Sequence, residues 1–161
     1  MRNYDDLVRQ AREQGHFKAD QSKIPLTTAI LGKLIVAAWA AENGRSDLPR
    51  RERVMAALLD RANDAPAEVR QVMHVDRRLT GPVIAEYSEY LASAQIDGLI
   101  KRYNPDYVRV AVEIDRATGA DLLNDYRDRP AVVEWVKSVT RKLLEPRSAR
   151  FVSEQHVRAS T

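Results

Sequence analysis

The 161-residue sequence contains no cysteine. This absence excludes disulfide bonds, thiolate metal ligands and a cysteine nucleophile, and it fits a reducing compartment. Glycine is also sparse, and the six glycines are dispersed rather than gathered in a phosphate-binding loop. No Gly-x-Ser-x-Gly motif of the kind found in serine hydrolases occurs. We therefore predict no catalytic residues, no cofactor and no enzymatic activity.

Clustered metal ligands are lacking too. The three histidines are His16, His74 and His156. They are far apart, whereas histidine ligands on a helix usually recur three or four residues apart. Asp121, Asp125 and Asp128 could together hold a divalent cation, but we interpret them as a solvated acidic helix face. We expect no bound metal.

A long hydrophobic run is the last missing feature. The most apolar stretch, residues 24–41, approaches the length of a short membrane span, but it contains Pro25, Gly32, Lys33 and five alanines. We interpret it as a buried core helix. The first six residues have no apolar core of a signal peptide. The sequence therefore predicts a cytoplasmic protein without membrane contact.

Helix start and stop residues recur along the whole chain. Asn3, Pro25, Asp47–Pro49, Asp64–Pro66, Asn104–Pro105 and Asp128–Pro130 are typical of helix starts, and Gly15, Asn43–Gly44, Gly81–Pro82, Asp97–Gly98, Thr118–Gly119 and Pro146 are typical of helix ends. A short helix is expected over 120–126 and a strong one over 130–144. These signals predict an all-α fold, a single-domain helical bundle of about six to eight helices over residues 1–146. A basic C-terminal tail, residues 147–161, follows it.

Residues 107–114 are ambiguous. Val108, Val110, Val112 and Ile114 alternate with other residues, as in a β-strand. The preceding Asn104–Pro105 indicates a helix start instead. Because a single strand has no obvious partner elsewhere in the chain, we predict a helix.

Charge is unevenly distributed. The net charge is +3 over residues 1–80, −4 over 81–136 and +4 over 137–161. Several basic residues cluster, and arginine suits phosphate because its planar guanidinium donates paired hydrogen bonds. The candidate nucleic-acid-binding residues are Arg50, Arg51, Arg53, Arg77, Arg78, Lys101, Arg102, Lys137, Arg141 and Lys142. Tyr103 and Tyr107 could supply stacking platforms for single strands. The competing interpretation, of about equal weight, is an ordinary solvated surface on which these cations pair with nearby carboxylates.

Two stretches carry a resemblance to a known family. Residues 24–44 form a proline-led apolar run with Trp39 that ends at Asn43–Gly44, and residues 131–144 combine Trp135 with basic residues. This pattern resembles the small α-helical subunit of CRISPR–Cas effector complexes. The resemblance covers about a quarter of the chain, and the tail after Pro146 departs from the family pattern. It implies a non-enzymatic subunit that contacts guide and target backbones, with Lys137, Arg141 and Lys142 in that role.

Our leading hypothesis is a nucleic-acid-associated helical accessory subunit that contacts the RNA or DNA backbone. It would act inside a larger assembly with other protein subunits, and it could also associate with copies of itself. A second hypothesis is a protein-binding adaptor, inhibitor or immunity protein, which would show an exposed apolar patch near Trp135 or near Tyr87 and Tyr90. A third is a winged helix-turn-helix regulator over residues 53–114, with 107–114 as the wing. A small enzyme with a carboxylate cluster ranks last.

Overall fold

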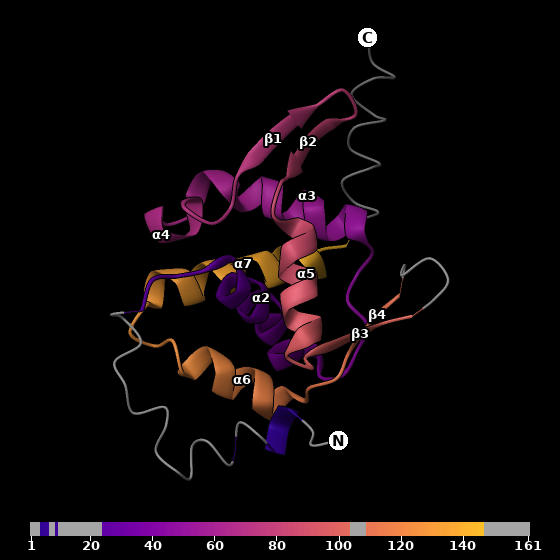
Figure 1. Cartoon of the computed structure of the whole chain (residues 1–161), viewed down its shortest axis with the longest axis vertical. Coiled ribbons are helices and arrows are strands. Elements are labelled where there is room, and N and C mark those ends of the chain that lie inside the picture. Colours follow the sequence, from indigo (N-terminus) through magenta and orange to yellow (C-terminus); the bar gives the residue numbers. More distant parts are fainter. Residues whose placement is uncertain (1–3, 7–8, 10–23, 104–108, 147–161) are drawn as a thin grey trace.

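Helices dominate the structure, and two short β-hairpins interrupt them (Figure 1). The computed structural model describes residues 4–6, 9, 24–103 and 109–146. In chain order the elements are α2 (Thr28–Asn43), α3 (Arg51–Arg61), the 3₁₀ turn η2 (Ala62–Asp64), α4 (Ala67–Arg70), β1 (Val75–Arg78), β2 (Gly81–Ile84), α5 (Tyr87–Ile96), β3 (Ile100–Arg102), β4 (Val110–Val112), α6 (Arg116–Asn124) and α7 (Pro130–Leu144).

The prediction of an all-α fold is wrong, because the chain forms a mixed, mostly helical fold with two antiparallel hairpins. Strands β1 and β2 pair with each other, and so do β3 and β4. Each strand has only three or four residues. Of these strands, only β4 lies in a segment, 107–114, whose alternation is typical of a strand.

Helix α2 lies at the centre of the fold. It begins at Thr28, three residues after Pro25, because the Thr27 hydroxyl accepts a hydrogen bond from the Ile30 amide (3.1 Å). It ends where Gly44, at a φ of 65°, donates its amide hydrogen to the Ala40 carbonyl. Nearly every residue from 31 to 40 is buried, and α5, α6 and α7 all pack against the helix. A helix that is apolar on all sides is expected in this position.

Two glycines allow the neighbouring helices to approach α2 closely. A Cβ atom at Gly32 would lie 2.6 Å from the backbone oxygen of Tyr90 in α5. A Cβ atom at Gly119 in α6 would lie 2.7 Å from the Ala37 oxygen of α2. Backbone contacts this short tolerate no side chain. The expected stop at Thr118–Gly119 is therefore wrong, since Gly119 lies inside α6 as a packing position.

The first hairpin replaces most of the helix predicted between Asp64–Pro66 and Gly81–Pro82. Val69 and Met73 are buried, but the helix ends after Arg70. Every residue of β1 is exposed, and Leu79 is fully exposed at the turn. The Gly81–Pro82 pair opens β2 and does not separate two helices. We call residues 75–84 the arm, because Figure 1 shows them projecting away from the helices.

The second hairpin resolves the ambiguity of residues 107–114. Val110, Ala111 and Val112 form β4, whose partner β3 lies only a few residues earlier in the chain. The predicted helix is therefore wrong over 110–112, because the strand does have a partner. The side chains of Val110 and Val112 are buried and belong to the hydrophobic core. Residues 104–108, including Tyr107, lie outside the described residues.

Helix α7 confirms the helix predicted over 130–144. Val132, Val136, Val139 and Leu143 are all buried against the other helices. Its cap is Arg129 rather than Asp128, and Pro130 occupies the first turn. The expected helix at 120–126 begins earlier, at Arg116, where Asp115 caps it.

The terminal predictions lie largely beyond what the structure describes. Residues 4–6 and 9 are helical, whereas the rest of the first predicted helix and the tail 147–161 fall outside the described residues. In the described part of the chain, no helix has both the length and the apolar character needed to cross a bilayer.

Gly119→Ala tests the packing of α6 on α2. Helix propensity alone would make this substitution stabilising by about 1 kcal/mol. Because the added methyl would meet the backbone of α2, we expect destabilisation by about 1–3 kcal/mol instead. Urea unfolding measures the change, and Ala120→Ser, at an exposed position of the same helix, is the control. A more stable Gly119→Ala protein would contradict the close contact.

Asp115→Ala tests the cap of α6. The Asp115 carboxylate accepts a hydrogen bond from the Thr118 amide (2.8 Å), which lowers its pKa below the ordinary value. A lowered carboxyl pKa stabilises the fold at neutral pH, and this contribution is lost as the pH falls through the folded-state pKa. We expect a loss of about 1 kcal/mol at neutral pH. The loss should shrink in unfolding experiments well below about pH 4, whereas Asp115→Asn should stay close to wild type throughout.

Candidate nucleic-acid interface

The structure distributes the ten predicted basic residues over three regions. The first region, at the start of α3 and along β3, contains Arg50, Arg51, Lys101 and Arg102. The second is the arm, with Arg77 and Arg78. The third comprises Arg53 on α3 and Lys137, Arg141 and Lys142 on α7.

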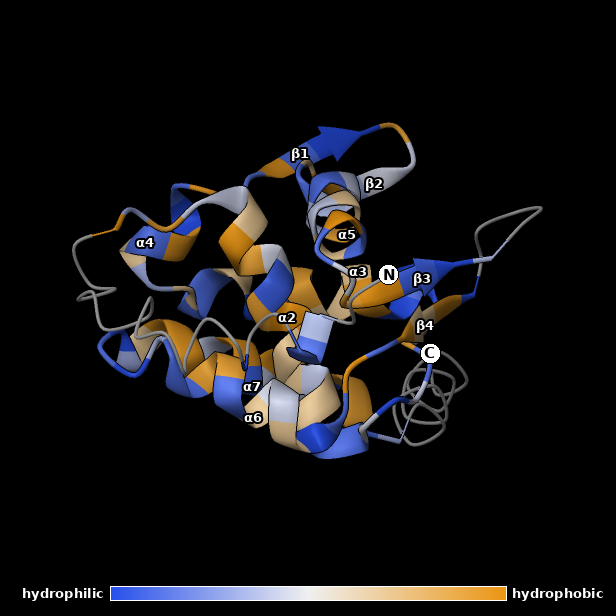
Figure 2. Ribbon diagram, turned by 60° about the horizontal axis from the view of Figure 1, so that its bottom comes forward, coloured by the Kyte–Doolittle hydropathy of each residue, from blue (hydrophilic) through white to orange (hydrophobic). Residues whose placement is uncertain are grey.

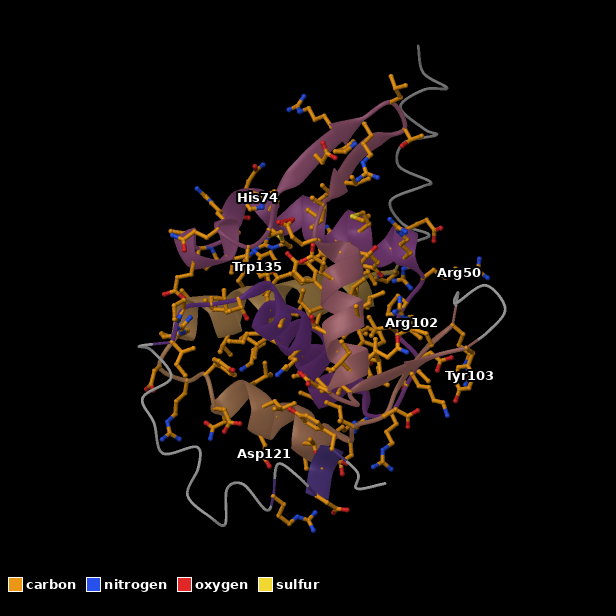
Figure 3. All side chains as sticks on the ribbon, viewed as in Figure 1. Arg50, His74, Arg102, Tyr103, Asp121 and Trp135 are labelled. Atoms are coloured by element: carbon orange, nitrogen blue, oxygen red, sulfur yellow. The ribbon has the colours of Figure 1, made fainter. Side chains whose placement is uncertain are left out.

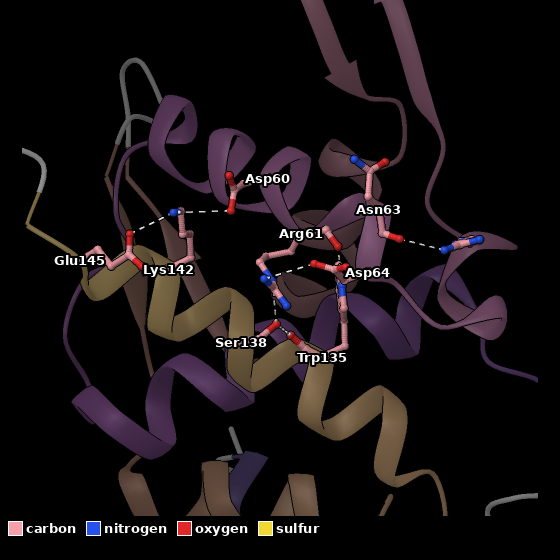
Figure 4. A network of polar contacts seen from close by, with 9 residues as sticks. Asp60, Arg61, Asn63, Asp64, Trp135, Ser138, Lys142 and Glu145 are labelled. Carbon is pink, nitrogen blue, oxygen red and sulfur yellow. Dashed lines mark hydrogen bonds and ion pairs between the residues drawn. The ribbon is translucent and has the colours of Figure 1, made fainter. Parts of the chain in front are cut away.

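The basic residues of α7 are largely occupied by carboxylates. Arg141 donates a hydrogen bond to Glu134 (2.6 Å), which lowers the pKa of that carboxyl. Lys142 lies between Asp60 (3.5 Å) and Glu145 (3.0 Å), as Figure 4 shows. Such pairing leaves little net positive charge for a phosphate. The competing interpretation of a solvated, paired surface therefore describes this end of α7 well.

Arg53 holds two helices together. It is half-buried, and its guanidinium donates to the Leu143 carbonyl at the end of α7. The last carbonyls of a helix lack partners within the helix, so a cation is favourable there. Arg53 is therefore turned toward the protein rather than toward a ligand.

A polar network also joins α3 to α7 further along (Figure 4). The Trp135 indole donates to the Arg61 carbonyl (2.8 Å), and the Arg61 guanidinium donates to the Ser138 hydroxyl (3.2 Å). Trp135 is buried, and so are Tyr87 and Tyr90. The exposed apolar patch expected of a protein-binding adaptor does not lie at these three residues.

Arg77 and Arg78 lie apart from the other basic residues. Both are exposed on β1, and Arg78 contacts Asp76 on the same strand (3.1 Å). In Figure 2 the outer part of β1 is hydrophilic. The arm thus presents a small basic surface at a distance from the helical core (Figure 1).

The remaining basic residues come together because the loop before α3 is attached to β4. The Leu48 amide donates to the Val110 carbonyl (2.9 Å), and the Arg109 guanidinium donates to Asp47 (2.6 Å). These two bonds place the start of α3 beside the second hairpin. Figure 3 shows Arg50, Arg102 and Tyr103 on the same side of the molecule.

A buried tyrosine shows how close the two segments are. The Arg51 guanidinium lies 5.5 Å from the centre of the Tyr87 ring. Burial raises the pKa of the Tyr87 hydroxyl to about 12, while the positive charges of Arg51 and Arg102 oppose this rise. Both cations therefore act on the same ring from different elements. Arg102 is further positioned by Gln95 of α5, whose side-chain oxygen accepts a bond from it (2.6 Å).

Tyr103 is the exposed aromatic residue of this surface. Its side chain is 41% exposed directly after β3. The Lys101 ammonium lies 5.8 Å and the Arg109 guanidinium 5.2 Å from the ring centre, both within the range of a cation–π contact. Sequence reasoning missed Arg109, because it lies in the segment predicted to be a helix. If the alternation of residues 107–114 is interpreted as a strand, Arg109 is indicated as an outward-facing residue.

We name this surface the basic hairpin face, formed by Arg50, Arg51, Lys101, Arg102, Tyr103 and Arg109. Of its five cations, Arg109 is neutralised by Asp47. Within the described part of the chain, Arg50, Arg51 and Lys101 form no ion pair. The face therefore combines available positive charge with an exposed ring.

The described residues contain no group of three histidines or carboxylates placed to hold a metal ion. His74 contacts Glu86 at the base of the arm, and the other two histidines lie outside the described residues. Comparisons of the chain with protein families, with curated proteins and with solved structures gave no match.

Lys142→Glu tests whether this lysine is structural. The substitution removes two ion pairs and places a third carboxylate beside Asp60 and Glu145, so we expect destabilisation by about 1–2 kcal/mol in urea unfolding. Lys137→Glu, at an exposed position of the same helix, should change stability by less than about 0.5 kcal/mol. Equal effects of the two substitutions would contradict the assignment.

Proposed function

We propose that this protein is a non-enzymatic, nucleic-acid-binding accessory protein that contacts the phosphate backbone through the basic hairpin face. One observation carries the proposal: cations from the start of α3 and from the second hairpin lie on one side of the molecule, where Lys101 and Arg109 flank the exposed ring of Tyr103. Convergence from distant segments distinguishes this face from ordinary dispersed surface charge.

The physical basis is electrostatic. Lysine and arginine that neutralise phosphates release bound counterions, so affinity falls steeply with salt. Arg50 and Arg51 are both exposed at the first turn of α3. Their guanidinium groups can donate paired hydrogen bonds to phosphate oxygens. Lys101 adds a third cation from β3.

The basic hairpin face replaces α7 as the proposed contact. Lys137, Arg141 and Lys142 were the residues that the CRISPR-subunit resemblance implied. Two of them are engaged by carboxylates. Because one small face spans only a few nucleotides, we propose that it acts together with other subunits of a larger assembly. Membership in a CRISPR effector complex stays a prediction.

The winged helix-turn-helix form of this hypothesis finds mixed support. Strand β4 does lie in the proposed wing, residues 107–114. However, the helix after the turn at Asn63–Asp64 is α4, which has only four residues. A recognition helix must present several side chains along the major groove. We therefore favour backbone contact over groove recognition.

A second candidate function, a protein-binding adaptor, is favoured by the arm. Leu79 is fully exposed at its turn, and Val75 is about half exposed on β1. Apolar side chains in such positions contribute little to folding and can contact a partner. The other residues of β1, Asp76, Arg77 and Arg78, are charged and exposed. The apolar surface of the arm is therefore small.

The proposal predicts salt-dependent binding that depends on position rather than on total charge. Fluorescence anisotropy with labelled single- and double-stranded oligonucleotides, repeated over a salt series, measures it. Arg50→Glu with Arg51→Glu should weaken binding at least about tenfold and lower the salt slope by about 1.5. Glutamates in the first turn of α3 are compatible with the helix dipole, so the variant should fold.

The matched control reverses the same charge on the arm, Arg77→Glu with Arg78→Glu, and should bind nearly as wild type. Equal losses in the two variants would indicate that net charge rather than the face governs binding. An unaltered protein that binds no oligonucleotide at low salt would contradict the proposed function.

A further inference from the structure

We infer that the basic hairpin face takes single-stranded nucleic acid, and that Tyr103, Lys101 and Arg109 form a subsite for one nucleotide. The base stacks on the Tyr103 ring, and Lys101 pairs with a phosphate of the same strand. The inference rests on the proposed function and names the class of nucleic acid that the face accepts.

Packing in the hydrophobic core does not explain the position of Tyr103. Its ring is not part of the hydrophobic core, and it is 41% exposed. Its backbone is nevertheless held in place, because the Tyr103 amide donates to the Arg109 carbonyl (3.3 Å) across the hairpin. An exposed ring on a defined backbone is a stacking platform, since every base has a π face that can pack on it.

The two cations beside the ring are held differently. The Arg109 guanidinium is tied to Asp47 (2.6 Å), so its charge is already compensated. Lys101 is exposed and, among the described residues, has no carboxylate partner. Only the lysine is therefore free to leave the ring when a base arrives and to move to a phosphate.

The geometry favours single strands over duplexes. In a duplex both faces of each base are covered by neighbouring bases, so a tyrosine ring finds no free face. An unpaired base offers such a face, and stacking on an aromatic residue contributes substantially to affinity without sequence preference.

The test uses the full-length protein with three probes: a fluorescein-labelled oligothymidylate, an abasic phosphodiester chain of the same length, and a duplex. We expect wild type to bind oligothymidylate about tenfold more tightly than the abasic chain. Tyr103→Leu should remove this preference without changing the salt slope, whereas Tyr103→Phe should retain it. Lys101→Gln should lower the salt slope by about 0.7, the value of one phosphate contact on a single strand.

Several results would overturn the subsite while leaving the proposed function intact. One is that wild type binds all three probes equally. Another is that Tyr103→Leu still binds oligothymidylate more tightly than the abasic chain. A third is that Tyr103→Leu loses affinity for the duplex and for the single strand to the same extent. Circular dichroism checks that each variant is folded. Failure of the proposed function is distinct, because wild type would then bind none of the probes.

Discussion

The close contact of α2 with α5 and α6 determines how the other elements are arranged. Gly32 and Gly119 bring α5 and α6 against the backbone of α2, closer than any side chain would allow. Close packing of this kind is specific, because an added methyl group must displace backbone rather than a flexible side chain. Helix α7 also packs against α2, which is therefore buried along most of its length.

The same contacts position the basic hairpin face. Strand β3 follows directly after α5, through the turn at Gly98, whose φ of 79° favours glycine. Strand β4 leads into α6, which begins at the Asp115 cap. The second hairpin therefore connects the two helices that the glycines press against α2. The loop after α2 is bonded to β4 through Leu48, so the start of α3 is placed by the same core. A surface that looks peripheral is thus determined by the centre of the fold.

The sequence predicted the parts of this fold that are repetitive and local. The apolar run 24–41 and the stripe of α7 span several helical turns, so their periodicity was sufficient to identify them. The hairpins are not evident from the sequence because each strand has only three or four residues, and because the alternating segment 107–114 follows Asn104–Pro105, which is typical of a helix start. Thr118–Gly119 resembles a helix end, since the sequence does not show that a second backbone lies beside Gly119.

The candidate site was predictable only in part. Clustering in the sequence indicates Arg50, Arg51, Lys101 and Arg102, but it indicates the lysines and arginine of α7 equally. The sequence does not show that Lys142 pairs with Asp60 from another helix. Arg53 was indistinguishable from its neighbours until its bond to the end of α7 was visible. Partners distant in the sequence decide which cations remain available to a ligand, and short-range patterns do not contain this information.

Hydrogen–deuterium exchange with and without a single-stranded oligonucleotide would locate the nucleic-acid contact without altering the protein. We predict slower exchange in residues 44–52, 99–103 and 109–112, around the start of α3 and the second hairpin. We expect unchanged exchange in the arm and in the last two turns of α7. Protection confined to the arm or to the end of α7 would contradict the proposed contact.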